Sequence, residues 1–241
     1  MGWWKSGWMI LMVVAGGVSS AWAQSDVVFE NDLVRWVIGG DGTIRSFSDK
    51  ASGTNYLASP APLATVKQSS AMLPAREVVY EGDAVTIRFG EQVTARIKVE
   101  THPRFFVITV LSVAGDSVEE LSFFDIPLSL KGTLEEPFAA TALAFNLQTN
   151  VWETPGPNSR VHALCYPKFG MEGAQAAIIA CPTAQLRDIM KEAVKTAPEL
   201  PQTDIGWPWA LDGEINRGSY LFDFGKVTEE TVDEWIATVK A

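Results

Sequence analysis

Residues 93–100 alternate without interruption between apolar and polar side chains, and this pattern constrains the fold more than any other feature of the sequence. Because successive side chains of an extended strand point to opposite faces, every apolar residue of this segment falls on one face. A break at 101–103 contains Pro103, and the segment 105–111 that follows is apolar on both faces. A strand that is apolar on both faces is typical of the buried centre of a two-layer structure. The two segments together predict neighbouring strands of a layered β structure.

Similar short runs, separated by glycine, aspartate and proline turns, extend from about residue 26 to residue 150. We expect further strands at 26–30, 33–38, 43–48, 63–68, 118–129 and 141–147, and a hairpin over 78–89 that turns at 81–83. The glycine-rich stretch 39–42 lies between two of these strands with no helix after it, so we interpret it as a hairpin turn and not as a phosphate-binding loop. The prediction is a mainly β fold: a large antiparallel β-sandwich (supersandwich) with two short helices towards the C-terminus.

The spacing of apolar residues becomes helical after residue 182. The first stripe consists of Leu186, Ile189, Met190, Ala193 and Val194. Thr183 is the expected N-cap of this helix, and Pro198 ends the segment. A second helix is expected to begin at the Thr228 cap, with a stripe at Val232, Trp235, Ile236 and Val239.

Residues 1–23 have the three parts of a secretory signal peptide. Lys5 supplies the positive charge, 8–18 is the apolar core, and the sequence Ala-Trp-Ala at 21–23 is a cleavage site. The apolar run is about half of the roughly 20 residues that a membrane span needs, so we expect no stable membrane anchor. The mature chain is then predicted to begin at Gln24 and to be secreted or periplasmic.

These boundaries divide the chain into a signal peptide at 1–23, a β-sandwich domain at 24–227 and a C-terminal helix at 228–241. The apolar stripe of the last helix needs a surface to pack on. The sequence leaves open whether that surface belongs to the sandwich or to a following domain that is missing here.

The chain contains 19 lysine and arginine residues against 29 aspartate and glutamate residues, a net charge of −10. Such a field repels a phosphate backbone, so we expect no nucleic-acid partner. Two histidines and two cysteines leave little material for a zinc site or a histidine-based triad. No nucleophile-elbow or P-loop motif occurs either. We therefore expect no cofactor and no metal ion.

Cys165 and Cys181 are the only cysteines. Export would permit a disulfide between them. If the two apolar runs that contain them form a hairpin closed at Tyr166 and Ala174, the two cysteines lie roughly 20 Å apart along the strands. A disulfide needs Cα atoms about 4.4–6.8 Å apart. We therefore predict two buried free thiols.

The segment 204–220 combines aromatic rings with carboxylates and an arginine, the residue types that bind sugars. The candidate binding residues are Trp207, Trp209, Asp212, Glu214 and Arg217. The alternative interpretation is that the two tryptophans plug one end of the sandwich.

Catalytic interpretations of the same sequence are also possible. Asp212 and Glu214 could form an acid pair for glycoside hydrolysis, which needs two carboxyl groups about 5–9.5 Å apart across a sugar. His102 lies in a predicted turn and His162 on a predicted strand. A single histidine in such a place is more often a surface or core residue than a base.

Two stretches resemble a known family. The segment 33–57, with Gly42-Thr43-Ile44 followed by Asp49-Lys50-Ala51-Ser52-Gly53, looks like the opening of a galactose-mutarotase-like β-sandwich domain of the kind that precedes the barrel in secreted glycoside-hydrolase-like proteins. The segments 170–181 and 218–222, each followed by a helix, resemble the junction between such a sandwich and its barrel.

The resemblance implies an exported, carbohydrate-associated sandwich, the non-catalytic N-terminal part of a glycoside-hydrolase-like protein whose following barrel supplies the catalytic residues. Its expected partner is a poly- or oligosaccharide. The alternatives are a stand-alone sugar epimerase or polysaccharide lyase that uses Asp212, Glu214 or His162, and a structural or protein-interaction module.

If the interpretation of 1–23 is correct, the exported product has lost this segment. N-terminal sequencing of the secreted protein is expected to begin at or near Gln24. Recovery of a chain that retains Met1 from the membrane pellet would contradict the signal-peptide prediction.

Overall fold

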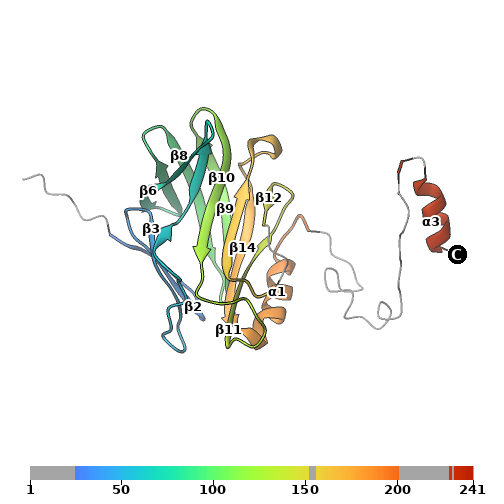
Figure 1. The fold of residues 1–241 in the computed structure, drawn as a ribbon, viewed down its shortest axis with the longest axis horizontal. Coiled ribbons are helices and arrows are strands. Elements are labelled where there is room, and N and C mark those ends of the chain that lie inside the picture. The colour runs from blue at the N-terminus through green and yellow to red at the C-terminus, as the bar shows by residue number, and fades with distance from the viewer. Residues whose placement is uncertain (1–24, 152–155, 201–227, 230, 241) are drawn as a thin grey trace, which may run out of the picture.

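The computed structural model describes residues 25–151, 156–200, 228–229 and 231–240. These residues form a mainly β structure of antiparallel sheets, and the only α-helices in the part described lie towards the C-terminus (Figure 1). The predicted fold class, a large antiparallel β-sandwich with two short C-terminal helices, is thereby confirmed.

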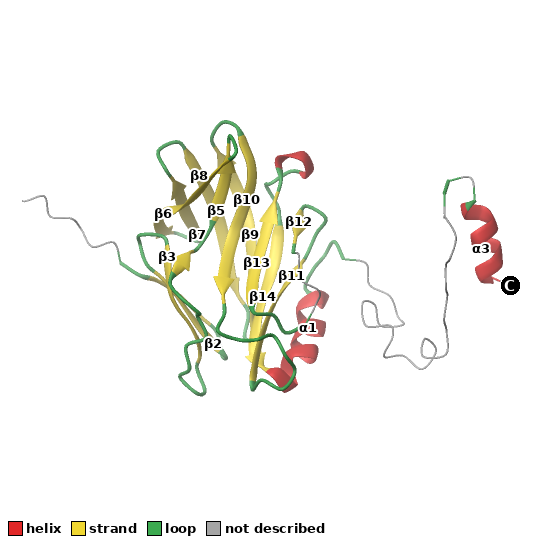
Figure 2. Cartoon of the chain, viewed as in Figure 1, coloured by secondary structure: helices red, strands yellow, loops and turns green. Residues whose placement is uncertain are grey.

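The strands, in chain order, are β1 (Val27–Glu30), β2 (Val34–Ile38), β3 (Thr43–Asp49), β4 (Ala61–Pro62), β5 (Thr65–Gln68), β6 (Ala71–Glu81), β7 (Ala84–Phe89), β8 (Val93–Thr101), β9 (Phe105–Ala114), β10 (Val118–Pro127), β11 (Phe138–Ala144), β12 (Thr149–Asn150), β13 (Arg160–Cys165) and β14 (Gln175–Pro182). The helices are the 3-10 turns η1 (Pro167–Phe169) and η2 (Thr183–Gln185) and the α-helices α1 (Leu186–Lys195) and α3 (Val232–Lys240). Figure 2 shows how strongly the strands outnumber the helices.

A small sheet in the order β1-β2-β3-β4 faces a larger sheet in the order β11-β14-β9-β8-β7-β6-β5-β10-β13-β12. The larger sheet curls over so that β11 lies beside β13, and the N–H of Asn158 donates to the carbonyl of Ala140 at 3.0 Å. The curled sheet therefore encloses its own core, and the small sheet closes one side of it (Figure 1).

Aromatic rings join the small sheet to the large one. Trp36 of β2 is fully buried, with its ring centroid 6.5 Å from that of Phe47 in β3 and 6.3 Å from that of Phe106 in β9. The indole N–H of Trp36 has no hydrogen-bond acceptor, which carries a desolvation penalty of about 1–3 kcal/mol. The apolar contacts of the large ring offset this penalty, since a buried aromatic contributes several kcal/mol.

A second core lies on the outer face of the larger sheet, beneath α1. All five residues of the predicted stripe are buried there, so the helix prediction is confirmed. The predicted N-cap is wrong. Thr183 begins η2 instead, and its hydroxyl donates to the carbonyl of Glu136 at 2.5 Å, so its side chain ties the helix to the β10–β11 connection.

The second predicted helix, α3, begins one turn later than its predicted cap. Thr228 opens the preceding turn, and its carbonyl accepts a hydrogen bond of 3.0 Å from the N–H of Val232. Val232 and Ile236, two members of the predicted stripe, are 37% and 45% exposed. Within the residues that the structure describes, no helix is long and apolar enough to cross a membrane.

The predicted hairpin between the two cysteine-containing runs is wrong. β13 pairs with β10 and β12, whereas β14 pairs with β9 and β11. The connection at 166–174 contains η1 and joins opposite ends of the strand order, so it is not a hairpin turn. The predicted free thiols are nevertheless confirmed, because Cys165 faces the enclosed core and Cys181 faces the core beneath α1.

Burial raises the pKa of Cys165 and of Cys181 to about 12. Since the thiolate is the reactive form, we expect neither thiol of the folded protein to react with a disulfide reagent at about pH 8. After unfolding in guanidinium without reductant, the same titration should find both thiols. Rapid reaction of the folded protein, or no reaction after unfolding, would contradict this placement.

Candidate functional site

The predicted binding residues Trp207, Trp209, Asp212, Glu214 and Arg217 lie outside the described residues, so the acid pair and the aromatic platform remain predictions. The two histidines are described and occupy different environments. His162 lies in β13 opposite Asp125 of β10 and is only 6% exposed. It is therefore a buried strand residue with little access for a substrate.

His102 lies at the turn between β8 and β9, as predicted. Its N–H donates to the carbonyl of Phe105 at 2.9 Å, and its ring stacks on that of Phe105 with centroids 4.4 Å apart and planes 9° apart. Stacking fixes the orientation of the imidazole while leaving the side chain half-buried. This orientation places His102 in the wall of a pocket beside the C-terminal end of α1.

We name this hollow the α1-edge pocket, and its volume is about 210 Å³. Its lining consists of Glu100, His102, Val107, Phe145, Gln175, Thr196 and Pro198. Val107 and Phe145 are 4% and 1% exposed and form an apolar floor. The acidic, imidazole, amide and hydroxyl side chains stand around it. An apolar surface with a few convergent polar groups is the usual construction of a small-molecule site.

Strand register explains why these side chains meet. Lys98 lies opposite Thr109 of β9, which lies opposite Gln175 of β14, so the three side chains form one row on the outer face of the sheet. Two residues further along β8, Glu100 lies opposite Val107 on the same face. The pocket is therefore built from three neighbouring strands.

Helix α1 forms the remaining wall. It covers the outer face of β11 and β14 and ends at Lys195, so the residues that line the pocket from this side are Thr196 and Pro198. An ion pair between Arg104, in the β8–β9 turn, and Glu192, on α1, joins the turn to the helix. Both side chains are more than a third exposed, so this pair contributes positioning more than stability.

A hydrogen-bond network holds the backbone of Gln175 in place. Its backbone N–H donates to the Thr149 hydroxyl at 2.7 Å, and that hydroxyl donates to the Asn146 amide oxygen at 2.9 Å. The Asn146 amide nitrogen donates to the carbonyl of Gly173 at 2.7 Å. Asn146 and Thr149 are buried, so the segment before β14 is held at several points.

Sequence reasoning identified His102 among these residues but missed Glu100, Gln175 and Thr196. Glu100 is one polar position in an alternating strand, and Gln175 and Thr196 stand at the ends of apolar runs. No local pattern distinguishes them from other solvated side chains, because only the pairing of β8, β9 and β14 brings them together.

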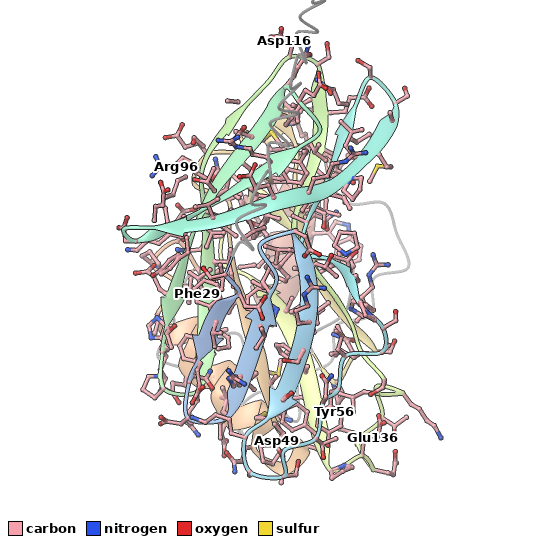
Figure 3. All side chains as sticks on the ribbon, turned by 90° about the vertical axis from the view of Figure 1, so that its left-hand side faces the viewer. Phe29, Asp49, Tyr56, Arg96, Asp116 and Glu136 are labelled. Carbon is pink, nitrogen blue, oxygen red and sulfur yellow. The ribbon has the colours of Figure 1, made fainter. Side chains whose placement is uncertain are left out.

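Another hollow, of about 420 Å³, lies between the β9–β10 turn and η1, at the end of the molecule where Figure 3 labels Asp116. Small and apolar residues dominate its lining, and Glu172 is its one charged side chain. The α1-edge pocket is the better candidate because it offers more hydrogen-bonding side chains over a buried floor.

The turn that carries the family resemblance has a structural role. The Asp49 carboxylate accepts the N–H groups of Ala51 and Ser52, each at 3.1 Å, and the Ser52 hydroxyl at 2.6 Å. Burial raises the pKa of Asp49, but these hydrogen bonds outweigh that effect and the pKa is lowered. Gly53 completes the turn with a φ of +72°, which favours glycine.

Figure 3 shows Asp49, Tyr56 and Glu136 gathered at one end of the molecule. Burial raises the pKa of Tyr56, and the two carboxylates raise it further. Its ring stacks on Phe138 with centroids 4.5 Å apart. Glu136 accepts the backbone N–H groups of 131–133, so both carboxylates are occupied by turns. Over the described ranges, no three His, Cys, Asp or Glu side chains are arranged to hold a metal ion.

No protein-family model matches this chain, and no curated protein matches it. Solved structures do match part of it. A galactose mutarotase-related enzyme from Lactobacillus acidophilus matches with a TM-score of 0.25 and 12% identity over 59% of this chain and 65% of that protein. A GH31 family sulfoquinovosidase from E. rectale matches with a TM-score of 0.28 and 11% identity over 64% of this chain and 32% of that protein. The chain thus spans less than two thirds of either protein, and neither match assigns it to a family.

Two acidic residues provide a test of which carboxylates are structural. Asp49→Asn is expected to lower the free energy of unfolding by about 1–3 kcal/mol at neutral pH, because an amide nitrogen replaces one of the two carboxylate oxygens that accept hydrogen bonds in this buried turn. Glu100→Gln should change it by less than about 0.5 kcal/mol.

The pH dependence follows from the lowered pKa of folded Asp49. Its stabilisation is present above the ordinary value of 3.8 and is lost as the pH falls through the folded pKa. The difference between the parent and Asp49→Asn should therefore shrink in urea unfolding at about pH 3. Equal effects of the two substitutions at neutral pH would contradict the distinction between turn and pocket.

Proposed function

We propose that this chain is an exported, carbohydrate-associated β-sandwich domain that binds a sugar ring in the α1-edge pocket. The observation that carries the proposal is the combination of a buried apolar floor, Val107 and Phe145, with the polar side chains of Glu100, His102 and Gln175 around it. Sugars present C–H groups on one face and hydroxyl groups at the rim, so they need both kinds of surface. A volume of about 210 Å³ suits one ring of a longer chain.

The proposal extends to the segment that follows the pocket in the sequence. Pro198 lines the pocket, and the aromatic and acidic segment begins at Asp204. In this proposal Trp207 and Trp209 stack on further rings of the same glycan. Asp212, Glu214 and Arg217 bind its hydroxyl groups. Support comes from the residue types alone.

Export is proposed from the sequence of 1–23, which gives a secreted or periplasmic product. The domain is proposed to be the non-catalytic N-terminal part of a glycoside-hydrolase-like protein, with a barrel domain following it. This part of the proposal rests on the resemblance at 33–57, 170–181 and 218–222.

A stand-alone sugar epimerase or polysaccharide lyase is the second candidate. It is favoured by the presence of a carboxylate and an imidazole, Glu100 and His102, in one pocket, where they could exchange a proton with a bound sugar. Turnover of a sugar that binds to the pocket, lost in both Glu100→Gln and His102→Asn, would establish this candidate over the binding domain.

The binding proposal is tested by titrating the mature chain, from Gln24 onwards, with a panel of soluble oligosaccharides while tryptophan fluorescence and heat are recorded. Gln175→Ala should weaken binding through the pocket. Trp207→Ala and Trp209→Ala should each weaken it about three- to tenfold, since one stacking contact is worth about 0.5–1.5 kcal/mol. Phe169→Ala, which removes an aromatic ring that is 58% exposed and lies outside the pocket lining, is the control and should bind normally.

Thermal melts separate binding from folding in the same variants. A tryptophan that plugs the sandwich would cost roughly 3–5 kcal/mol of stability when replaced by alanine, whereas a binding residue would leave the melting temperature nearly unchanged. Absence of binding by the parent chain across neutral, amino and acidic oligosaccharides would overturn the proposed function.

A further inference from the structure

We infer that the α1-edge pocket selects sugars that carry a protonated amine over neutral sugars, and neutral sugars over uronic acids; this inference rests on the proposed sugar-binding function of the same pocket. The protein already uses several of the hydrogen-bond donors of the pocket. Most of the side-chain sites that remain are acceptors, and one of them is a carboxylate.

Gln175 lines the pocket with its side-chain amide. One of the two N–H groups of this amide donates to the hydroxyl of Thr109 at 2.9 Å, so one donor is occupied within the sheet. An amide has a carbonyl oxygen with two lone pairs at its other end. The side chain therefore offers a ligand the two lone pairs of its oxygen and a single remaining N–H.

Thr196 is left as an acceptor for the same reason. Its hydroxyl donates to the carbonyl of Ala193, one turn back in α1, at 2.7 Å. A hydroxyl has one proton and two lone pairs, so the proton is used and the lone pairs remain. Thr196 is exposed at the pocket rim, where a ligand can reach it.

Glu100 contributes a carboxylate, which only accepts. The ammonium group of Lys98 donates a hydrogen bond of 3.2 Å to one of its oxygens and not to the other. The Glu100 side chain is 43% exposed, so it can meet a ligand without first being uncovered. No lysine or arginine side chain lines the pocket.

The electrostatic field around the pocket is negative, like the charge of Glu100. The pocket lies at the C-terminal end of α1, where the helix dipole places a partial negative charge. Two nearby cations are paired, Lys98 with Glu100 and Arg104 with Glu192, while the exposed Lys195 in the last turn of α1 adds one positive charge beside Thr196. The whole chain carries a net charge of −10.

A ligand that matches this set of atoms brings donors and positive charge. The ammonium group of an amino sugar has three N–H donors and no acceptor, and it gains charge-assisted hydrogen bonds from Glu100. The hydroxyls of a neutral sugar can donate to the same acceptors without the charge. A uronate brings a second carboxylate beside Glu100, and the lining offers it no lysine or arginine side chain in exchange.

The experiment is an NMR titration of the isotope-labelled mature chain with the methyl β-glycosides of glucosamine, glucose and glucuronic acid, below the pKa of the glucosamine amine. The side-chain amide signals of Gln175 report binding at the pocket. We expect the glucosamine glycoside to bind about three- to tenfold more tightly than the glucose glycoside, as a partly exposed charge pair allows. The glucuronide should bind more weakly than both, and the preference for glucosamine should fall with added salt.

Charge variants test whether the Glu100 carboxylate produces the preference for glucosamine. Glu100→Gln should abolish the preference for glucosamine, because the glucosamine affinity should fall much more than the glucose affinity. Glu91→Gln removes the same charge from the exposed β7–β8 turn, outside the pocket lining, and should keep the preference. Lys98→Gln frees the Glu100 oxygen that Lys98 holds and should increase the preference.

The outcomes separate this inference from the function on which it rests. Binding of the glucose or glucuronic acid glycoside as tight as that of the glucosamine glycoside would overturn the selectivity and leave sugar binding intact. A glucosamine preference that survives in Glu100→Gln would also overturn it, because the charge would then act elsewhere. If none of the three glycosides shifts the Gln175 signals, the proposed sugar site itself is wrong.

Discussion

The packing of α1 on the outer face of β9, β11 and β14 is the interaction on which the rest of this structure depends. A helix of ten residues does not persist alone in water, so its stripe needs the sheet, and the apolar outer face of these strands needs the helix. Ten helical residues span about 15 Å, whereas the ten residues of β9 span about 33 Å. The helix is therefore too short to cover the whole face. The α1-edge pocket lies where the cover ends and the polar row of Lys98, Thr109 and Gln175 begins.

Two-sided burial also sets the chemistry of the strands beneath the helix. β14 has six consecutive buried residues, because the enclosed core lies on one side and α1 on the other. The small side chains of Ala176, Ala177 and Ala180 let the enclosed core and α1 both pack closely against this strand. Cys181 is buried by the same arrangement, and its raised pKa follows from loss of water and not from a catalytic environment.

The polarity of the pocket is a product of hydrogen bonds made inside the protein. Gln175 and Thr196 each have donors and acceptors, yet the sheet uses one of the two amide N–H groups of Gln175 and α1 uses the hydroxyl proton of Thr196. What remains for a ligand from these two side chains is mostly lone pairs, and they lie beside the Glu100 carboxylate. Composition alone contains no such information, because it counts side chains and not their free atoms. The selectivity proposed for amino sugars follows from this remainder.

The sequence by itself determined the fold class, most of the strands and the apolar stripe of α1, because side-chain periods of two and of about 3.6 follow from local backbone geometry. It also placed His102 in a turn and both thiols in buried strands. Only the tertiary structure decided which strands are neighbours. β13 and β14 follow one another in the chain but belong to distant places in the sheet order, since pairing depends on burial of whole faces and not on the length of a loop. The same long-range pairing brings Glu100, Gln175 and Thr196 into one pocket, and no local pattern encodes it.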